Sequence, residues 1–353
     1  MTKVFVPMDS AALSMGANEV AQAIFELTTK ANLDVTIVRN GSRGMLWLEP
    51  LVEVETAAGR VGYANVSPDQ IPELIATGFL SGASHSSCLG LVEELDFLKN
   101  QTRITFARVG VIDPLLLVEY EAHGGLKGLR KALTISPAKI VSEVTESGLR
   151  GRGGAGFPAG IKWNTVLNTE SEQKYICCNA DEGDSGTFAD RMLMEGDPFT
   201  LIEGMIIAGI AVGATEGLIY VRSEYPHAID VLNQALAIAT EHKLLGDSVL
   251  GSEFKFNLEV RVGAGSYVCG EETAMLESLE GKRGMVRAKP PIPALVGLFG
   301  KPTVINNVMT LAAVPMILAD GASSYQTFGV DRSRGTQVFQ LAGNILRGGI
   351  VEL

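Results

Sequence analysis

A glycine-rich segment in the middle of the chain has the residue types of a loop that binds an anion. Residues 148–156 contain five glycines, and Arg150, Arg152 and Lys162 supply positive charge. Glycine adopts left-handed conformations and lets a phosphate approach main-chain N–H groups, while the cations neutralise the charge that those groups only solvate. Ordering so flexible a loop is costly in conformational entropy, which favours a binding role. The segment predicts a site for the phosphate of a nucleotide or a flavin.

Three polar clusters are the other candidates for chemistry. They lie at residues 179–184 and 263–272, each after a predicted strand, and at the pair Asn306-Asn307, which follows the short apolar run Val304-Ile305. Ligands of parallel α/β sheets bind beyond the carboxyl ends of the strands, so we expect the clusters to face one crevice together with the glycine loop. The two adjacent amides stand in an apolar context, where a ring with alternating donors and acceptors supplies the partners that they need.

Simpler roles stay open for several residues in these clusters. Glu271 and Glu272 are also the carboxylates that the first turn of a helix attracts. Asp181 or Asp184 can serve only to close a turn. Tyr267 is of a residue type that is more often packed than functional.

Common catalytic motifs are missing. Gly151, Gly153 and Gly156 satisfy G-x-G-x-x-G, but the segment before them is predicted as a helix where a dinucleotide-binding fold needs a strand. Neither G-x-x-x-x-G-K-[ST] nor the H-R-D and D-F-G triplets of kinases occur. No Ser/His/Asp set or metal-ligand cluster is visible, and no C-x-x-C pair occurs, so we expect no metal site in this chain. A bound cofactor would then carry the reaction, as in hydride transfer to a flavin.

The predicted elements indicate an α/β protein of three parts. Residues 1–118 have the element order of a thioredoxin-like domain without its redox cysteine pair. Residues 119–325 alternate strands with helices, which indicates a Rossmann-like domain with a mostly parallel sheet, and residues 326–353 resemble the start of a small β-rich, ubiquitin-like domain. The expected strands are 4–6, 34–38, 46–55, 61–66, 175–179, 217–222 and 256–262, and the expected helices are 17–31, 68–77, 137–146, 198–212, 226–243 and 270–280.

Composition narrows the function further. The chain has 353 residues, of which 46% are hydrophobic, enough for two or three domains with full-sized cores. Its net charge of −11, without any run of Lys or Arg, argues against a nucleic-acid partner. The N-terminus lacks signal-peptide and transit-peptide features, and the longest apolar run, 204–214, is too short to span a bilayer. We expect a cytoplasmic protein with no membrane span.

Several separated motifs, in the right order between about residues 130 and 320, resemble the FMN- and NADH-binding subunit of respiratory complex I and its soluble relatives. The motifs are G-L-R-G-R-G-G-A-G-F-P from Gly148, C-N-A-D-E from Cys178, G-E-E-T-A from Gly270, K-P-P from Lys289 and I-N-N-V from Ile305. The resemblance implies that a subunit of this kind exchanges a hydride between NAD(H) and bound FMN. It then passes electrons to or from iron–sulfur clusters.

The resemblance also implies which residues bind each cofactor. It assigns FMN to Gly151, Arg152, Gly153, Gly154, Lys162, Asn179, Asp181, Gly270, Glu271, Asn306 and Asn307. It assigns NADH, stacked on the flavin, to Phe157, Glu182, Asp184, Glu272 and Lys289. Because the hydride is transferred at FMN itself, Glu182 is the single candidate for a catalytic side chain. Thr165 and Ile292 stand where family members often place aromatic residues on the adenine, which predicts weaker NADH binding.

Among the relatives, the N-terminal extension most resembles the beta subunit of soluble NAD-dependent formate dehydrogenases, and the diaphorase subunit of NAD-reducing hydrogenases is the nearest alternative. The implied partners are a thioredoxin-like [2Fe-2S] gamma subunit and a larger molybdenum or hydrogenase subunit. The implied [4Fe-4S] cluster belongs to a C-terminal part that is not present in these residues, so we expect the chain to be a fragment. A non-catalytic assembly scaffold is the alternative from a different class.

Overall fold

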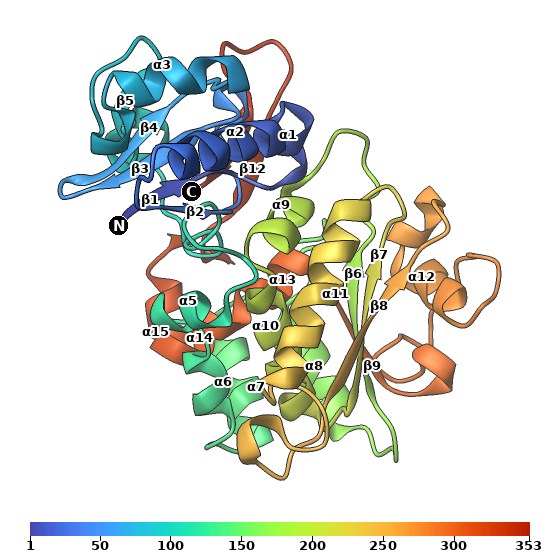
Figure 1. Cartoon of the computed structure of the whole chain (residues 1–353). Helices are drawn as coiled ribbons and strands as arrows, with labels where there is room; N and C mark the ends of the chain where they lie inside the picture. Colours follow the sequence, from blue (N-terminus) through green and yellow to red (C-terminus); the bar gives the residue numbers. More distant parts are fainter. The chain divides into compact units, whose positions relative to one another are not determined.

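The computed structural model describes all 353 residues, which form two compact units (Figure 1). The first unit comprises Met1–Pro114 and Gln337–Leu353, and the second comprises Leu115–Thr336. The mixed α/β fold class expected from the sequence is confirmed. The three-domain division with boundaries at 118 and 325 stays a prediction.

The first unit is built on a five-stranded mixed sheet in the order β2-β1-β3-β4-β5. β1 and β2 are parallel, and the other neighbouring pairs are antiparallel, as in the thioredoxin-like order that we expected. Helix α2 buries Val20 and Ile24 in the core that this sheet forms. The elements are β1 (Thr2–Phe5), α1 (Ser10–Ser14), α2 (Ala17–Lys30), β2 (Val35–Val38), η1 (Leu46–Leu48), β3 (Val52–Thr56), β4 (Gly59–Tyr63), η2 (Pro68–Gln70), α3 (Ile71–Ala76), η3 (Phe79–Ser81), β5 (Cys88–Leu91), η4 (Val92–Glu94), α4 (Asp96–Lys99), β12 (Val338–Leu341) and β13 (Gly349–Glu352).

The last residues of the chain form an antiparallel hairpin, β12–β13, that belongs to the first unit. The buried carboxylate of Glu352 accepts the main-chain N–H groups of Ile104, Thr105 and Phe106 at 3.0, 2.8 and 2.9 Å. A carboxylate held by several N–H donors is a strong charge-assisted anchor, so this side chain fixes the hairpin to residues 104–106. The ubiquitin-like identity expected for residues 326–353 stays a prediction.

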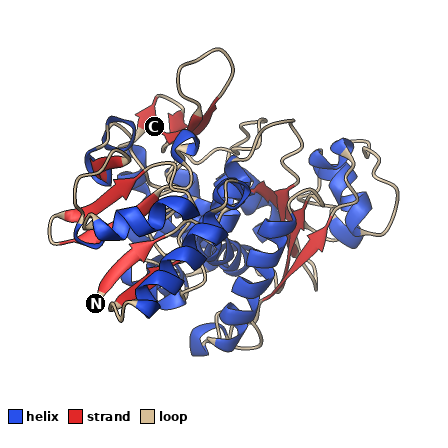
Figure 2. Cartoon of the chain, turned by 45° about the horizontal axis from the view of Figure 1, so that its top comes forward, coloured by secondary structure: helices blue, strands red, loops and turns tan.

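The second unit is built on a four-stranded parallel sheet in the order β8-β7-β6-β9, seen as red arrows between helices in Figure 2. Helices α10 and α11 lie along one face and α12 on the other (Figure 1). Alternate residues of the strands, among them Cys177, Leu218 and Ile305, pack with Met275 and Leu276 of α12. Both faces of the sheet are therefore covered, as predicted for parallel strands.

The elements of the second unit fall in the following order. They are α5 (Leu117–Ala122), α6 (Lys127–Ala132), α7 (Pro137–Glu146), α8 (Ala159–Asn168), β6 (Tyr175–Ala180), α9 (Ala189–Gly196), α10 (Pro198–Val212), β7 (Glu216–Val221), α11 (Pro226–Glu241), η5 (Val249–Gly251), β8 (Asn257–Val262), η6 (Tyr267–Gly270), α12 (Glu272–Leu279), η7 (Leu298–Gly300), β9 (Thr303–Asn307), α13 (Val308–Ala312), α14 (Val314–Asp320), α15 (Ala322–Gln326), β10 (Gly329–Val330) and β11 (Ser333–Arg334). None of the helices in the structure is long and apolar enough to cross a membrane.

Two predicted elements differ in the structure. Residues 46–55 do not form one strand, because Pro50, which has no N–H to donate, separates η1 from β3. The helix predicted over 270–280 begins only at Glu272, because the Glu271 side chain caps it and the residues before it form the separate turn η6. Helix α10 has the predicted bounds, since Pro198 stands at its first position and Gly213 ends it in the left-handed conformation.

Candidate functional site

The glycine loop connects α7 to α8. The Gly151 N–H donates to the Phe157 carbonyl at 2.9 Å and closes the loop, within which Gly154 and Gly156 have φ values of +102° and +60°. The N–H groups of residues 153–157 donate to no backbone oxygen. Side-chain-poor backbone with unengaged N–H groups is an anion cradle, so the loop has the chemistry that a phosphate needs.

Arg152 belongs to the glycine loop, but its side chain points to another part of the chain. Arg152 donates its backbone N–H to Thr310 Oγ1 at 2.8 Å, while its Nη2 atom donates to the Tyr325 hydroxyl and to the carbonyls of Arg334 and Thr336. We expected the charge of Arg152 to face the phosphate. In the structure its guanidinium instead binds residues 325–336. Its contribution to the loop is the backbone.

Lys162 lies within a cluster of four charged side chains. Its Nζ donates to the Ile305 carbonyl at 2.6 Å and stands 3.6 Å from Glu272 Oε2. Lys289 Nζ lies 2.9 Å from Glu271 and 2.8 Å from Glu272. Burial lowers the pKa of Lys162, whereas Glu272 and Glu271 outweigh burial and raise the pKa of Lys289. The sequence prediction that these four residues share one site is consistent with this cluster.

Glu271 has the capping role that the sequence left open. It is the N-cap of α12, and its Oε2 accepts the N–H groups of Thr273 and Ala274 at 2.8 and 2.9 Å. Burial acts to raise its pKa, but the hydrogen bonds from Thr273 and Lys289 outweigh it, so the pKa lies below its usual value. Glu271 is therefore an anion that fixes the start of α12 next to the charged cluster.

The asparagines lie where β6 and β9 end. Asn179 is the Cα partner of Asn307 in the parallel ladder, and its Nδ2 donates to the Gly270 carbonyl at 2.8 Å. Asn306, only 6% exposed, accepts the indole N–H of the buried Trp163 at 2.9 Å. The ladder therefore joins the polar clusters at 179–184 and 306–307, and the hydrogen bond to Gly270 adds the cluster at 263–272.

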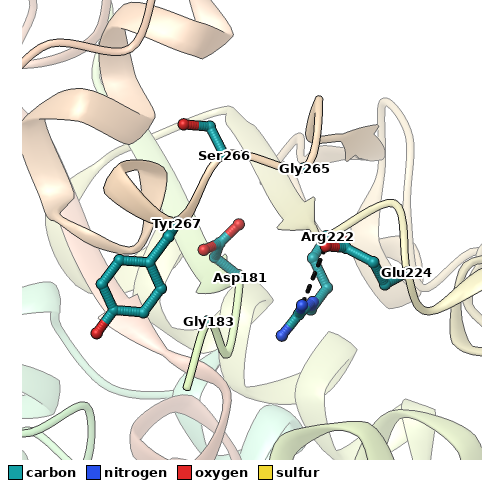
Figure 3. Close-up of a pocket in the computed structure, with 7 residues that line it drawn as sticks. All are labelled: Asp181, Gly183, Arg222, Glu224, Gly265, Ser266 and Tyr267. Carbon is teal, nitrogen blue, oxygen red and sulfur yellow. Dashed lines mark hydrogen bonds and ion pairs between the residues drawn. The ribbon is translucent and has the colours of Figure 1, made fainter. Parts of the chain in front are cut away.

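Asp181 and Gly183, in the loop after β6, line an open polar pocket of about 80 Å³ (Figure 3). The carboxyl of Asp181 points into it between Tyr267 and Arg222, and burial raises the pKa of Asp181 to about 6. The pocket is lined by Asp181, Gly183, Arg222, Glu224, Gly265, Ser266 and Tyr267.

Tyr267 differs from the expectation of a packed side chain. It is 71% exposed, and its hydroxyl donates to Asp184 Oδ1 at 2.9 Å. Phe157 of the glycine loop is likewise 49% exposed. An aromatic ring kept in water at the rim of a polar pocket is a candidate contact for a ligand. Its place in the 263–272 cluster is the one sequence signal that points to Tyr267.

Glu182 is turned to helix α9. Its Oε1 accepts the Asp190 N–H at 2.9 Å, and its Oε2 accepts the Arg191 N–H at 3.1 Å and the Tyr225 hydroxyl at 3.0 Å. The carboxylate predicted as an NADH contact and possible catalytic group is thus engaged by three donors of its own chain. These contacts support a positioning role for Glu182.

The donor set fits FMN. The cradle is tight, because a Cβ atom on Gly153 would lie 3.2 Å from Asn307 Cβ, and one on Gly270 would lie 3.3 Å from Asp181 Oδ2. Amide groups, unengaged loop N–H groups and the ammonium of Lys162 together offer what a ring with alternating donors and acceptors and a phosphate monoester require. Sequence reasoning missed Thr310, Trp163 and Asp190, because helices α13, α8 and α9, on which they lie, were not predicted.

Comparisons with known proteins agree with this geometry. Residues 144–316 match the family model of the Nuo51 FMN-binding domain. The chain is 50% identical over 255 residues to the NADP-reducing hydrogenase subunit HndC of Solidesulfovibrio fructosivorans, covering 72% of this chain and 52% of that protein. It is 51% identical over 251 residues to an NADH-quinone oxidoreductase subunit of Rhizobium meliloti, covering 71% of this chain and 60% of that protein.

A solved structure extends the likeness to the whole chain. The structure of an NAD⁺-reducing [NiFe]-hydrogenase in the H₂-reduced state aligns with 100% of this chain and 58% of the compared chain, with a TM-score of 0.61 and 28% sequence identity. The chain thus spans between about half and three fifths of the length of these relatives.

Proposed function

Because this chain carries the FMN-binding domain of the FMN- and NADH-binding subunits of respiratory complex I and its soluble relatives, we propose that it exchanges a hydride with NAD(H) at bound FMN. When bound, FMN accepts the hydride as an electron pair and releases the electrons singly. The protein supplies binding, orientation and electrostatics. The observation that carries the proposal is the Thr310 hydroxyl, which joins the Arg152 N–H to Asn307 and so seats the glycine loop on the end of β9.

The proposed division of roles follows from the contacts. The glycine loop and Lys162 hold the phosphate, and the amides at the ends of β6 and β9 hold the remainder of FMN. Lys289 and Lys162 together balance the charges of Glu271 and Glu272, which allows an anionic dinucleotide to approach the two carboxylates. Asp184 with Tyr267, and Phe157 from the loop, form an exposed rim for NADH.

Purified protein incubated with FMN tests the proposal directly. We expect retained yellow colour, quenched flavin fluorescence and NADH-dependent reduction of an artificial dye. Protein that stays colourless contradicts the proposal. Protein that retains FMN but reduces no dye supports instead the assembly scaffold as the second class of function.

We also propose two candidates for the enzyme with which this module exchanges electrons. A formate dehydrogenase is supported by the thioredoxin-like first unit without a redox cysteine pair, and the module is then its beta subunit in the cytoplasm. A hydrogenase is supported equally by the whole-chain likeness to an NAD⁺-reducing hydrogenase. In either complex we propose a thioredoxin-like [2Fe-2S] subunit as partner and [4Fe-4S] clusters on the electron path. The native complex distinguishes the two alternatives: a formate dehydrogenase should reduce NAD⁺ with formate, and a hydrogenase should reduce it with H₂.

A further inference from the structure

Strand β8 forms one edge of the parallel sheet, and its outer side has no neighbouring strand. The sheet order β8-β7-β6-β9 gives β8 a partner only on the side of β7 (Figure 1). Directly after β8, the Gly263 N–H donates to the Val221 carbonyl of β7 at 2.7 Å. Because successive residues of a strand turn their N–H and C=O groups to opposite sides, Leu258, Val260 and Val262 turn theirs away from β7.

These outward backbone groups are open to another strand. Leu258, Val260 and Val262 make no backbone hydrogen bond outside the sheet, and the Val262 side chain is 55% exposed. The pairing of β8 with β7 runs from Asn257 to Val262 without a register shift, and this stretch contains no proline. Bulges and prolines are devices that keep an edge from pairing, so an edge without them is a template for a further strand.

The sequence of β8 is complementary to itself in the antiparallel direction. Leu258-Glu259-Val260-Arg261-Val262 alternates apolar and charged residues, with the acid and the base on either side of the central valine. In an antiparallel pair of β8 strands centred on Val260, Leu258 of each copy lies opposite Val262 of the other, and Glu259 lies opposite Arg261. The outward residues then form the pairs that exchange two N–H···O bonds.

The two charged side chains are accessible to such a partner. Arg261 Nη2 lies 2.6 Å from Glu259 Oε1, and the two side chains are 57% and 53% exposed. An exposed pair of this kind contributes little to the stability of the single chain. Opposite charges directly across an antiparallel pair are favourable, whereas like charges are not. A register centred on Leu258 or on Val262 would set neither charge opposite the other, so charge complementarity selects Val260 as the centre.

We propose that two copies of this chain associate through β8, which pairs with its own copy in the antiparallel direction about a twofold axis at Val260. The two parallel sheets then form one continuous sheet, and each copy covers the free edge of the other. A single pair of strands buries less area than a permanent interface, so we expect a reversible dimer that forms with rising protein concentration. FMN and NADH take no part in this contact.

Sedimentation velocity of the purified chain over a range of concentrations tests the charge pairs. Glu259→Arg and Arg261→Glu should each raise the dimer dissociation constant about tenfold, because each sets like charges opposite one another. An equal mixture of the two variants should associate within about threefold of the original protein, since one strand then carries the bases and the other the acids. Lys139→Glu, a charge reversal at an exposed ion pair on α7, is the matched control and should change nothing.

Val260→Pro tests the backbone pairing. Proline removes the N–H at the centre of the strand pair, so the dissociation constant should again rise about tenfold. In the single chain this N–H faces outward, where an edge strand tolerates proline, so the variant should still unfold cooperatively on heating. The mixing experiment stands independently if this variant does not fold.

Three results would overturn the proposal. The first is a chain that stays monomeric at every concentration, which would leave the β8 edge to a strand of another protein. The second is a dimer whose dissociation constant neither charge reversal changes. The third is a mixture of Glu259→Arg and Arg261→Glu that associates no better than its components. Because the readout is the mass of the particle, failure of FMN binding leaves the outcome of this test unaffected.

Discussion

Asn179 on β6 and Asn307 on β9 are direct partners in a parallel ladder, so their side chains emerge side by side where the two strands end. Asn179 reaches the turn before α12 through Gly270, and Asn307 caps α13 through Thr310. Each asparagine therefore ties the end of a strand to the start of another element. A cofactor bound at this edge meets amides whose orientation is already fixed by the fold, which lowers the entropy cost of binding.

Gly154→Ala should weaken FMN binding at least tenfold, because the loop backbone requires a φ of +102° that alanine adopts only with strain. Gly213→Ala is the matched control, since Gly213 also has positive φ (+75°) and open space around it, but it ends α10. Both variants should lose about 1 kcal/mol of stability. Only the first should lose FMN in a fluorescence titration, and equal affinities would contradict an FMN role for the loop.

Lys289→Met should raise the KM for NADH about tenfold with a smaller change in kcat. Without this ammonium, Glu271 and Glu272 keep only the more distant Lys162, so an anionic dinucleotide meets uncompensated carboxylates. Steady-state dye reduction measures both constants. Lys282→Met removes an exposed lysine that pairs with Glu280 at 2.7 Å and should leave them unchanged. An unaltered KM in Lys289→Met would remove Lys289 from the NADH path.

Periodicity and terminator residues predicted the regular elements well. Helix α10 was placed from Pro198 to Val212, because a proline opens it and a glycine closes it. Helix α9 was missed, because its cap is Glu182 rather than a residue next to the helix, and no local pattern contains such a contact. Strand β9 was missed because it is short and runs directly into α13.

In the candidate site, too, the sequence predicted which residues come together but not which way their side chains point. Residue types and motif spacing brought the polar clusters together, and the ladder between β6 and β9 agrees. The direction of each side chain depends on contacts distant in the sequence. Arg152 donates to residues 325–336, and Asn306 accepts from Trp163. Such pairings are set by tertiary packing, which hydrophobic periodicity does not encode.

Ile292→Phe should lower the KM for NADH about fivefold. Ile292 is 45% exposed and stands where the sequence resemblance leads us to expect an aromatic residue on the adenine, and stacking of a base on an aromatic ring contributes about 1–3 kcal/mol. Ile345→Phe, at a position 49% exposed in the first unit, is the matched control for added aromatic surface. A fivefold lower KM in the control as well would show that the gain is unspecific.

Asp181→Asn should stabilise the flavin-free protein, and more so at high pH. Burial raises the pKa of Asp181 to about 6, above its value in the unfolded chain. The folded state therefore binds the proton more tightly, and this contribution, complete at acid pH, is lost as the pH rises through about 6. At pH 8 the buried carboxylate is charged and costs stability, which the neutral amide avoids. Because water enters the pocket, we expect a gain of only about 1 kcal/mol, a rise in Tm of roughly 2–4 °C.

Thermal unfolding at pH 5 and pH 8 measures this gain. At pH 5 the Asp181 carboxyl is mostly protonated in the folded protein but ionised in the unfolded chain, so the difference between variant and original should fall to roughly half of its value at pH 8. Asp320→Asn removes an exposed aspartate and should give the same small change at both pH values. A Tm difference for Asp181→Asn that does not depend on pH would mean that this carboxyl is ionised in the folded protein throughout, with the Arg222 guanidinium as its counter-charge.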